Sequence, residues 1–324
     1  MNRLVQLLIL LLLATPAAAQ QFPSKPINMV VVFAPGGATD VLARIAGDHM
    51  SRTLGQRVIV ENVTGAGGTV GGARGAQAAP DGYTLTVGSM GSHSAAPTIY
   101  ASSIKYNPLE LEPIGVIGGT PLYFMVRNEF PAKTFEEFAA QVKTNPGKIS
   151  NAHAGVGSTN HLAYLLLTHL TGLSFNSVAY RGEGPAMSDL VAGHIDSGAF
   201  FAPAAVPQLQ AGKVRALMIA QTDRAAVTPA IPTSKEAGVE QFLLQGWAAV
   251  FAPKGTPKPV VAKLSEALQA AVADPAGRAR IEELGAVPAT GETATPEYLA
   301  RMLKSDIERW AVVIKAAGIS EPAN

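Results

Sequence analysis

Short runs of β-forming residues alternate with amphipathic stretches along almost the whole chain, and this alternation limits the folds that are open to it. Residues 27–33 (INMVVVF) are nearly continuously apolar and predict a buried strand. Residues 40–54 then place their apolar side chains on one face, which predicts a helix that ends at Gly55. Strands and helices that alternate in this way predict an α/β fold.

The same pattern continues to the C-terminal region. Thr134 and Glu137 have the spacing of a capping box, and Thr295 precedes a proline at a first helical position. We predict further helices at residues 134–142, 161–170, 259–273, 277–284 and 296–317. We predict further strands at residues 57–61, 83–87, 113–118, 122–127, 177–180, 195–201, 215–220 and 247–252.

The first residues have the composition of a targeting segment. Arg3 is followed by the apolar residues 4–13 and then by the small residues 17–19 (AAA). An apolar run of about ten residues is too short to span a bilayer, so we predict a signal peptide that is cleaved after Ala19. No later stretch is apolar enough for a transmembrane helix, and the lack of cysteine excludes a lipoprotein anchor and disulfides. We therefore expect an exported, periplasmic protein with no membrane anchor.

Length and charge limit the organisation and the partners of the chain. A mature chain of roughly 300 residues suits two domains of roughly 100–150 residues each. No low-complexity linker is present, so we expect the chain to cross between the domains on strands, at residues 122–127 and 247–252. The formal net charge of +1 and the lack of a basic run argue against nucleic acid as a partner.

Residues 33–40 (FAPGGATD) lead from the first predicted strand into the first predicted helix. Glycines allow a tight turn that exposes backbone N–H groups, and a helix start adds free N–H donors and a partial positive charge. Such a turn can bind a carboxylate. A structural turn in which Thr39 or Asp40 caps the helix is the alternative. The candidate ligand contacts here are Pro35, Gly36, Gly37, Ala38, Thr39 and Asp40.

Residues 154–161 (AGVGSTNH) show the same order of strand, glycine turn and helix in the other half of the chain. Hydroxyl groups at a helix start can cap the helix and can also donate to a bound anion. Two opposed helix starts would suit a ligand that is held from both sides. The candidate contacts here are Gly157, Ser158, Thr159 and His161.

Three further segments supply candidate contacts. The loop at residues 88–93 follows a predicted strand, at the end of the sheet where open α/β folds bind ligands, and it contributes Ser89, Ser92 and His93. Arg181 can pair with a carboxylate, although a solvated arginine is the common alternative. Phe200 and Phe201 can line a cleft or fill the core around a buried strand.

Signatures of enzymes and of cofactor sites are missing from the sequence. No G-x-S-x-G or H-E-x-x-H motif occurs, and the histidines lack the spacing of metal ligands. The glycines at residues 65–72 have the wrong spacing for a dinucleotide site, so we interpret them as a structural loop. We expect no cofactor, no metal and no catalytic residue. An exported hydrolase is a less favoured alternative, because no nucleophile can be assigned.

Many short stretches, in order over about 300 residues, resemble the substrate-binding proteins of tripartite tricarboxylate transporters, the Bug receptors of Gram-negative bacteria. The matching stretches are residues 23–27 (PSKPI), 33–40 (FAPGGATD), 60–62 (VEN), 65–68 (GAGG), 79–85 (APDGYTL), 91–93 (GSH), 155–163 (GVGSTNHLA), 211–213 (AGK), 215–217 (RAL), 236–238 (EAG), 251–253 (FAP) and 255–257 (GTP).

This resemblance implies a type II periplasmic-binding-protein fold, in which two α/β lobes close around a ligand cleft. Residues 20–122 and 250–324 would form lobe 1, and residues 123–249 would form lobe 2. Proteins of this family deliver small organic acids to a membrane permease, and some are thought to feed signalling systems instead. The resemblance assigns the grip on the carboxylate to residues 35–40 and 157–161, with help from residues 89–93. We expect a monomer, because a receptor presents both lobes to its permease.

The chain departs from this family at several positions. Many relatives have Phe-Asp-Asn where this chain has residues 199–201 (AFF), and such an aspartate could pair with an amino group of the ligand. Its absence leads to the hypothesis that the ligand is a carboxylate without an amine. One such ligand would be an aromatic acid that stacks on Phe200 or Phe201. Arg181 replaces the usual lysine, and Ser89 and Ala96 stand where asparagine is common.

Overall fold

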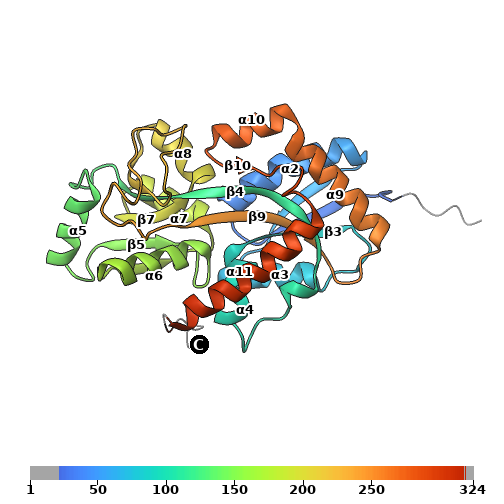
Figure 1. Ribbon diagram of the computed structural model, residues 1–324, viewed down its shortest axis with the longest axis horizontal. Helices are drawn as coiled ribbons and strands as arrows, with labels where there is room; N and C mark the ends of the chain where they lie inside the picture. Colours follow the sequence, from blue (N-terminus) through green and yellow to red (C-terminus); the bar gives the residue numbers. More distant parts are fainter. Residues whose placement is uncertain (1–21, 317, 319–324) are drawn as a thin grey trace, which may run out of the picture.

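The computed structural model describes residues 22–316 and residue 318, so the predicted signal peptide and its cleavage site lie outside the described residues. Within the described part, ten strands form one sheet in the order β2-β1-β3-β9-β4-β7-β5-β6, with β8 and β10 also paired to β4. Helices lie above and below the central strands (Figure 1). This arrangement confirms the predicted α/β fold.

The described elements have the following bounds. The strands are β1 (Ile27–Val31), β2 (Val58–Asn62), β3 (Thr84–Ser89), β4 (Glu112–Arg127), β5 (Ser150–His153), β6 (Asn176–Ala179), β7 (Ser197–Phe201), β8 (Val214–Ile219), β9 (Gln245–Ala252) and β10 (Val287–Pro288). The helices are α2 (Ala38–Leu54), α3 (Thr69–Ala76), α4 (Ala96–Ile99), α5 (Phe135–Thr144), α6 (Thr159–Thr171), α7 (Glu183–Val191), α8 (Ala202–Gln210), α9 (Lys258–Ala273), α10 (Pro275–Glu283) and α11 (Pro296–Ala316). Short helical turns are η1 (Ala66–Gly68), η2 (Met90–Ala95) and η3 (Pro108–Glu110).

The sheet has two parts, one around β1, β2 and β3 and the other around β5, β6 and β7. Each part contains parallel strands whose carboxyl ends meet at one edge. β1 pairs in parallel with β2 and β3, and all of its apolar side chains are buried. β5 pairs in parallel with β6 and β7. Parallel pairing requires a crossover, which helices supply here. The glycine turns that follow β1 and β5 therefore leave the sheet at the ends of strands, where α/β proteins bind ligands.

Strand β4 belongs to both parts of the sheet. Its residues up to Pro121 pair with β9, whereas its residues from Leu122 onward pair with β7 and β8. Figure 1 shows β4 and β9 running side by side across the middle of the molecule. The sequence pattern predicted two separate strands here, at residues 113–118 and 122–127, and this prediction was wrong because β4 is continuous. Gly118 and Gly119 continue the ladder by pairing with β9 and β10.

The buried apolar residues form two clusters. The larger one lies among α2, β1, β3, β4, β9, α9 and α11 and extends to the helices α5 and α6. The smaller one lies around α7, α8 and the outer half of β4, and it includes Tyr123, Leu190, Phe200 and Val206. Phe200 is only 1 % exposed, so it serves as a core side chain.

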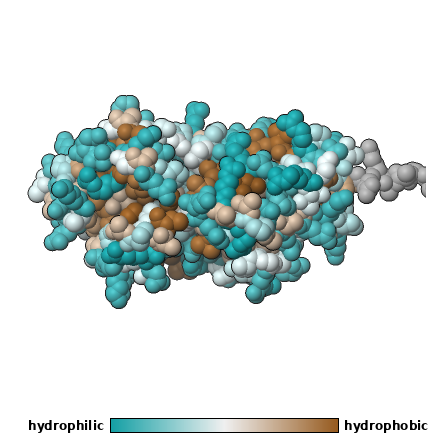
Figure 2. Space-filling model, turned by 90° about the horizontal axis from the view of Figure 1, so that it is seen from above, coloured by the Kyte–Doolittle hydropathy of each residue, from teal (hydrophilic) through white to brown (hydrophobic). Residues whose placement is uncertain are grey.

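The surface of the protein is mainly polar. Figure 2 shows one face on which hydrophilic residues predominate and apolar residues form scattered small patches. In the part of the chain that the structure describes, no helix has the length and apolar character that a membrane span requires.

Candidate functional site

Two helix starts line one narrow cavity. The helix α2 begins after the glycine turn that follows β1, and α6 begins after the glycine turn that follows β5. The cavity between them has a volume of about 20 Å³, which is space for about one water molecule. Its lining comes from elements of both parts of the sheet and consists of Phe33, Gly37, Ala38, Thr39, Ser89, Thr120, Ala154, Thr159, Asn160, Glu183, Phe201, Gly246, Trp247 and Ala248.

The turn before α2 is fixed by Asp40. Gly36 has a positive φ of 83°, a conformation that favours glycine. The carboxylate of Asp40 accepts a hydrogen bond from the N–H of Gly36 at 3.0 Å and forms an ion pair with Arg44 at 2.8 Å. Burial acts to raise the pKa of Asp40, but the bonds from Arg44, Gly36 and Asn62 outweigh it and hold the pKa below its usual value. Asp40 is therefore ionised and structural, and it does not line the cavity.

Gly37 determines where α2 begins and what can approach it. Its extended backbone, with φ −82° and ψ 167°, occupies the N-cap position, so the helix starts at Ala38 rather than at residue 40 as predicted. A Cβ atom on Gly37 would lie 3.1 Å from Cβ of Glu183. The missing side chain thus allows a segment from the other part of the sheet to pack directly against the helix start.

The turn before α6 is held by a serine and two histidines. Oγ of Ser158 accepts a hydrogen bond from the N–H of His161 at 3.2 Å, so the helix starts earlier than predicted. Nδ1 of His161 accepts from the N–H of Gly157 at 3.3 Å. Nδ1 of His153 accepts from the N–H of Gly155 at 3.2 Å. Burial lowers the pKa of both histidines, to about 3 for His161, so both rings are neutral and able to accept these bonds.

The end of β3 contributes one residue to the cavity, and the following turn η2 places two residues behind it. Ser89 lines the cavity, and its N–H donates to Oγ of Ser92 at 3.0 Å. Oγ of Ser92 lies 2.9 Å from Nδ1 of His93, whose ring stacks on Phe251. Burial lowers the pKa of His93 to about 3, so its ring is neutral. Ser92 and His93 therefore support Ser89 from within the core.

Direct contacts close the walls around the cavity. The N–H of Gly91 donates to Oγ1 of Thr159 at 2.9 Å, which joins η2 to the start of α6. A Cβ atom on Gly184 would lie 2.0 Å from the carbonyl oxygen of Pro35, so the turn before α2 and the first turn of α7 touch through backbone. Only glycine permits this approach at position 184.

Glu183 is the principal site residue that the sequence pattern missed. Its Oε2 accepts a hydrogen bond from the N–H of Ala38 at 2.9 Å. Its Oε1 accepts from the N–H of Phe201 and from Nδ2 of Asn160, the latter at 3.2 Å. Burial raises the pKa of Glu183 to about 7, although these three donors act to lower it. A carboxyl group thus forms part of the cavity wall and lies against two helix starts.

The structure brings six of the sequence-predicted residues into the cavity lining and places ten outside it. The lining residues are Gly37, Ala38, Thr39, Ser89, Thr159 and Phe201. The others lie in the adjoining turns and core, except for the exposed Arg181, and are Pro35, Gly36, Asp40, Ser92, His93, Gly157, Ser158, His161, Arg181 and Phe200.

The sequence reasoning omitted eight residues of the cavity lining. Gly246, Trp247 and Ala248 lie on a predicted strand, but nothing in the pattern marks that strand as cavity wall. Glu183 lies between two glycines at the start of a helix, where an acidic residue usually faces solvent and complements the helix dipole. Its position in the site depends on the opposite part of the sheet, which local sequence does not describe.

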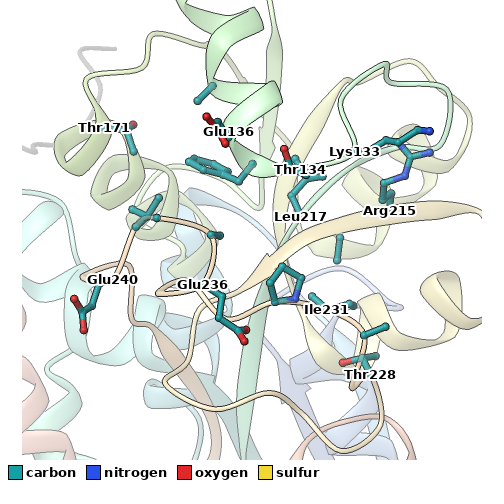
Figure 3. Close-up of a pocket in the computed structure, with 18 of the residues that line it drawn as sticks. Lys133, Thr134, Glu136, Thr171, Arg215, Leu217, Thr228, Ile231, Glu236 and Glu240 are labelled. Atoms are coloured by element: carbon teal, nitrogen blue, oxygen red, sulfur yellow. The ribbon is translucent and has the colours of Figure 1, made fainter.

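A larger hollow of about 1290 Å³ lies elsewhere, between α5, the end of α6, β8 and residues 228–241 (Figure 3). Three of its charged groups, Arg215, Glu236 and Glu240, have protein partners. Arg215 donates to the carbonyl groups of Phe130 and Ala132. Glu236 forms an ion pair with Arg224 at 2.9 Å. Among the described helices, the start of α5 is the one helix start in the lining of this hollow, whereas the starts of two helices, α2 and α6, line the small cavity, so the small cavity is the candidate site.

The described residues show no arrangement suited to a metal ion. Within the described ranges, no group of three or more histidine, aspartate or glutamate side chains could hold one. The cavity instead presents backbone N–H groups, the hydroxyl groups of Thr39, Ser89 and Thr159, and one carboxyl group. Such a set can hold a small polar anion by hydrogen bonds.

Comparisons with known proteins show the family of the chain. The sequence pattern of the TctC family, described as the tripartite tricarboxylate transporter family receptor, matches residues 42–319. The chain is 36 % identical to protein BugT of Bordetella pertussis over 307 residues, which cover 94 % of this chain and 93 % of BugT.

Solved structures show the same architecture. The periplasmic binding protein BugD superposes with a TM-score of 0.89 at 39 % identity, over 93 % of this chain and 100 % of BugD. MatC from Rhodopseudomonas palustris, solved with bound malate, superposes with a TM-score of 0.87 at 39 % identity, over 90 % of this chain and 100 % of MatC. The chain therefore has the periplasmic-binding-protein fold and belongs to the tripartite tricarboxylate transporter receptor family, whose members are solute-binding proteins and not enzymes.

Proposed function

We propose that this chain is a periplasmic receptor that captures a small organic carboxylate between two lobes and delivers it to a tripartite tricarboxylate membrane permease. One observation carries the proposal: the starts of α2 and α6 line the same cavity. Backbone N–H groups and the partial positive charge at both helix starts favour an anion there. The bound malate in MatC, which shares 39 % of its sequence with this chain, supports a carboxylate as the ligand.

We assign residues 20–122 and 250–324 to lobe 1 and residues 123–249 to lobe 2. The change of partners on β4 between Pro121 and Leu122 supports this division. The strands β4 and β9 would then form the hinge. The cavity is much smaller than a dicarboxylate, so a ligand can be admitted only if the lobes part and then close on it.

The ligand contacts are proposed in two groups. The lining residues Gly37, Ala38, Thr39, Ser89, Thr159 and Phe201 would touch the ligand, and the other predicted residues would hold the loops in place. Phe201 is the phenylalanine that would stack on an aromatic acid, since it lines the cavity as well as packing in the larger core cluster, whereas Phe200 does not line the cavity. The lack of an acid at residues 199–201 no longer argues against an amine on the ligand, because Glu183 places a carboxyl group in the same cavity.

Export is part of the same proposal. A signal peptide cleaved after Ala19 would release a mature chain that begins at Gln20 and works as a monomer in the periplasm. Mass spectrometry of the chain from the periplasmic fraction would identify its first residue. Retention of residues 1–19 would contradict the cleavage.

A thermal-shift screen tests the function. The mature protein is unfolded and refolded to remove any bound solute, and is then heated with citrate, succinate, malate, adipate, aspartate, glutamate, nicotinate, benzoate, phthalate or terephthalate. A ligand that binds only the folded state raises Tm by mass action. We expect a concentration-dependent rise in Tm with at least one of these acids and none with neutral sugars. A flat response to the whole panel would contradict carboxylate binding.

A further inference from the structure

Glu183 occupies the donors that a ligand carboxylate would be expected to use. Its Oε2 accepts from Ala38, in the first turn of α2, and its Oε1 accepts from Phe201 and Asn160. Ala38 lies in the proposed lobe 1, whereas Glu183 and its other two partners lie in lobe 2. One buried carboxyl group therefore joins both walls of the cavity, and it is only 5 % exposed.

No cation of the described chain balances a charge on Glu183. The three groups that bond to it are a side-chain amide and two backbone N–H groups. Within the described residues, Glu183 forms no ion pair. The titratable groups of the surrounding elements have other partners or face solvent: Asp40 pairs with Arg44, His161 accepts from Gly157, His153 accepts from Gly155, His93 lies against Ser92, and Arg181 is exposed.

We propose that Glu183 is a ligand-binding residue that carries a proton whenever a carboxylate occupies the cavity, so that capture of the ligand above neutral pH takes up one proton. This inference rests on the proposed function, since it requires a carboxylate between the starts of α2 and α6. Two carboxylates in one buried site repel each other strongly. A protonated Glu183 instead donates its O–H to a ligand oxygen in a charge-assisted hydrogen bond.

The state of Glu183 without ligand is consistent with this coupling. Burial already raises its pKa to about 7, so loss or gain of the proton needs only a small change in the surroundings. An anion in the cavity raises the pKa further. The proton comes from the solvent onto an Oε atom of Glu183 as the ligand binds, and it returns to the solvent when the ligand leaves. Ligand affinity therefore falls by about tenfold for each pH unit above about pH 7, until the pKa of the complex is reached.

Calorimetric titration with malate tests the proposal on the refolded mature protein. If malate gives no thermal shift, the panel acid with the largest shift replaces it. Titrations at about pH 8 in two buffers with different ionisation enthalpies give the number of protons taken up. We expect nearly one proton for the wild type. The ligand carboxyls, with ordinary pKa values of about 4, are ionised throughout and add no proton of their own.

Two variants separate Glu183 from other causes of pH dependence. Glu183→Gln keeps the shape but cannot titrate, so it should take up almost no proton and should show an affinity that is flat with pH. Its absolute affinity is not the readout, because the amide NH₂ faces the N–H of Ala38 in one of its orientations. Glu266→Gln, at an exposed position on α9, should behave like the wild type.

The outcomes distinguish this inference from the proposed function. Binding without proton uptake, or equal uptake by wild type and Glu183→Gln, would overturn the role of Glu183 and leave carboxylate capture standing. Tight binding of aspartate without proton uptake would overturn it as well and would make Glu183 a partner of the ligand amine. No binding of any panel acid would overturn both proposals together.

Discussion

The backbone N–H of Gly91 donates a hydrogen bond to Oγ1 of Thr159 at 2.9 Å, although 68 residues separate them along the chain. The bond joins the loop after β3 to the first turn of α6. A Cβ atom on Gly91 would lie 2.6 Å from the N–H nitrogen of Thr159, so the two segments are in backbone contact. This contact lies beside the cavity and crosses from one proposed lobe to the other, which makes Thr159 important for closure as well as for ligand binding.

Replacement of both hydroxyl residues at the start of α6 should weaken ligand binding. The double variant Ser158→Ala/Thr159→Ala should lose about 1–3 kcal/mol of binding free energy, the usual cost of hydrogen bonds to a charged group. Loss of the Ser158 cap should also lower the free energy of unfolding by about 1 kcal/mol. Titration calorimetry gives the first quantity and urea unfolding the second. Thr144→Ala, at an exposed position on α5, serves as the control. Unchanged affinity in the double variant would remove this turn from the site.

Gly184→Ala should block closure without disturbing the fold. Its added Cβ would lie 2.0 Å from the carbonyl oxygen of Pro35, a contact that only separation of the turns can relieve. We expect at least a tenfold loss of affinity, which is about 1.4 kcal/mol, and a larger radius of gyration in X-ray scattering. Gly291→Ala, where the new Cβ meets nothing within 4 Å, is the matched control. A Gly184→Ala protein with wild-type affinity and size would show that these turns need not meet.

Stability should fall as the pH rises, through the carboxyl group of Glu183. Its folded-state pKa is raised to about 7 from a usual value of 4.5, so the folded protein retains a proton that the unfolded chain has already lost. The free energy of unfolding should therefore decrease between about pH 4.5 and pH 7, by on the order of 3 kcal/mol, and then level off. Urea unfolding of wild type and Glu183→Gln across this range isolates the contribution as the difference between the two curves. Parallel curves would contradict the raised pKa.

The two neighbouring phenylalanines should respond differently to substitution. Phe200 packs in the core with Tyr123 and Leu190, so Phe200→Ala should lower the free energy of unfolding by about 3–5 kcal/mol. The folded fraction of this variant should keep its ligand preference. Phe201 lines the cavity, so Phe201→Ala should change the relative affinities for aromatic and aliphatic acids. Equal changes of preference in both variants would contradict a ligand contact that Phe201 makes and Phe200 does not.

The sequence predicted the parts of the site that depend on local pattern. The glycine turns before α2 and α6 and the loop after β3 could be located because each contains glycine and lies between a strand and a helix. The predicted starts of α2 and α6 lie two residues too late, because the N-cap conformations of Gly37 and Ser158 determine where these helices begin.

The remaining features depend on contacts between distant segments. The continuation of β4 through Gly118 and Gly119 depends on its pairing with β9 and β10, which the strand's own residues do not indicate. Glu183 is buried because Ala38, 145 residues away, supplies one of its donors and Gly37 leaves it room. No local pattern distinguishes it from a solvated acid at a helix start.

The position of a bound carboxylate tests the central claim most directly. The measurement is a crystal structure of the refolded mature protein with the panel acid that gives the largest rise in Tm. We predict a ligand carboxylate within hydrogen-bond distance of N–H groups in the first turns of α2 and α6, with Glu183 beside it. A ligand bound in the larger hollow of Figure 3, or in contact with one helix start alone, would contradict capture between two lobes.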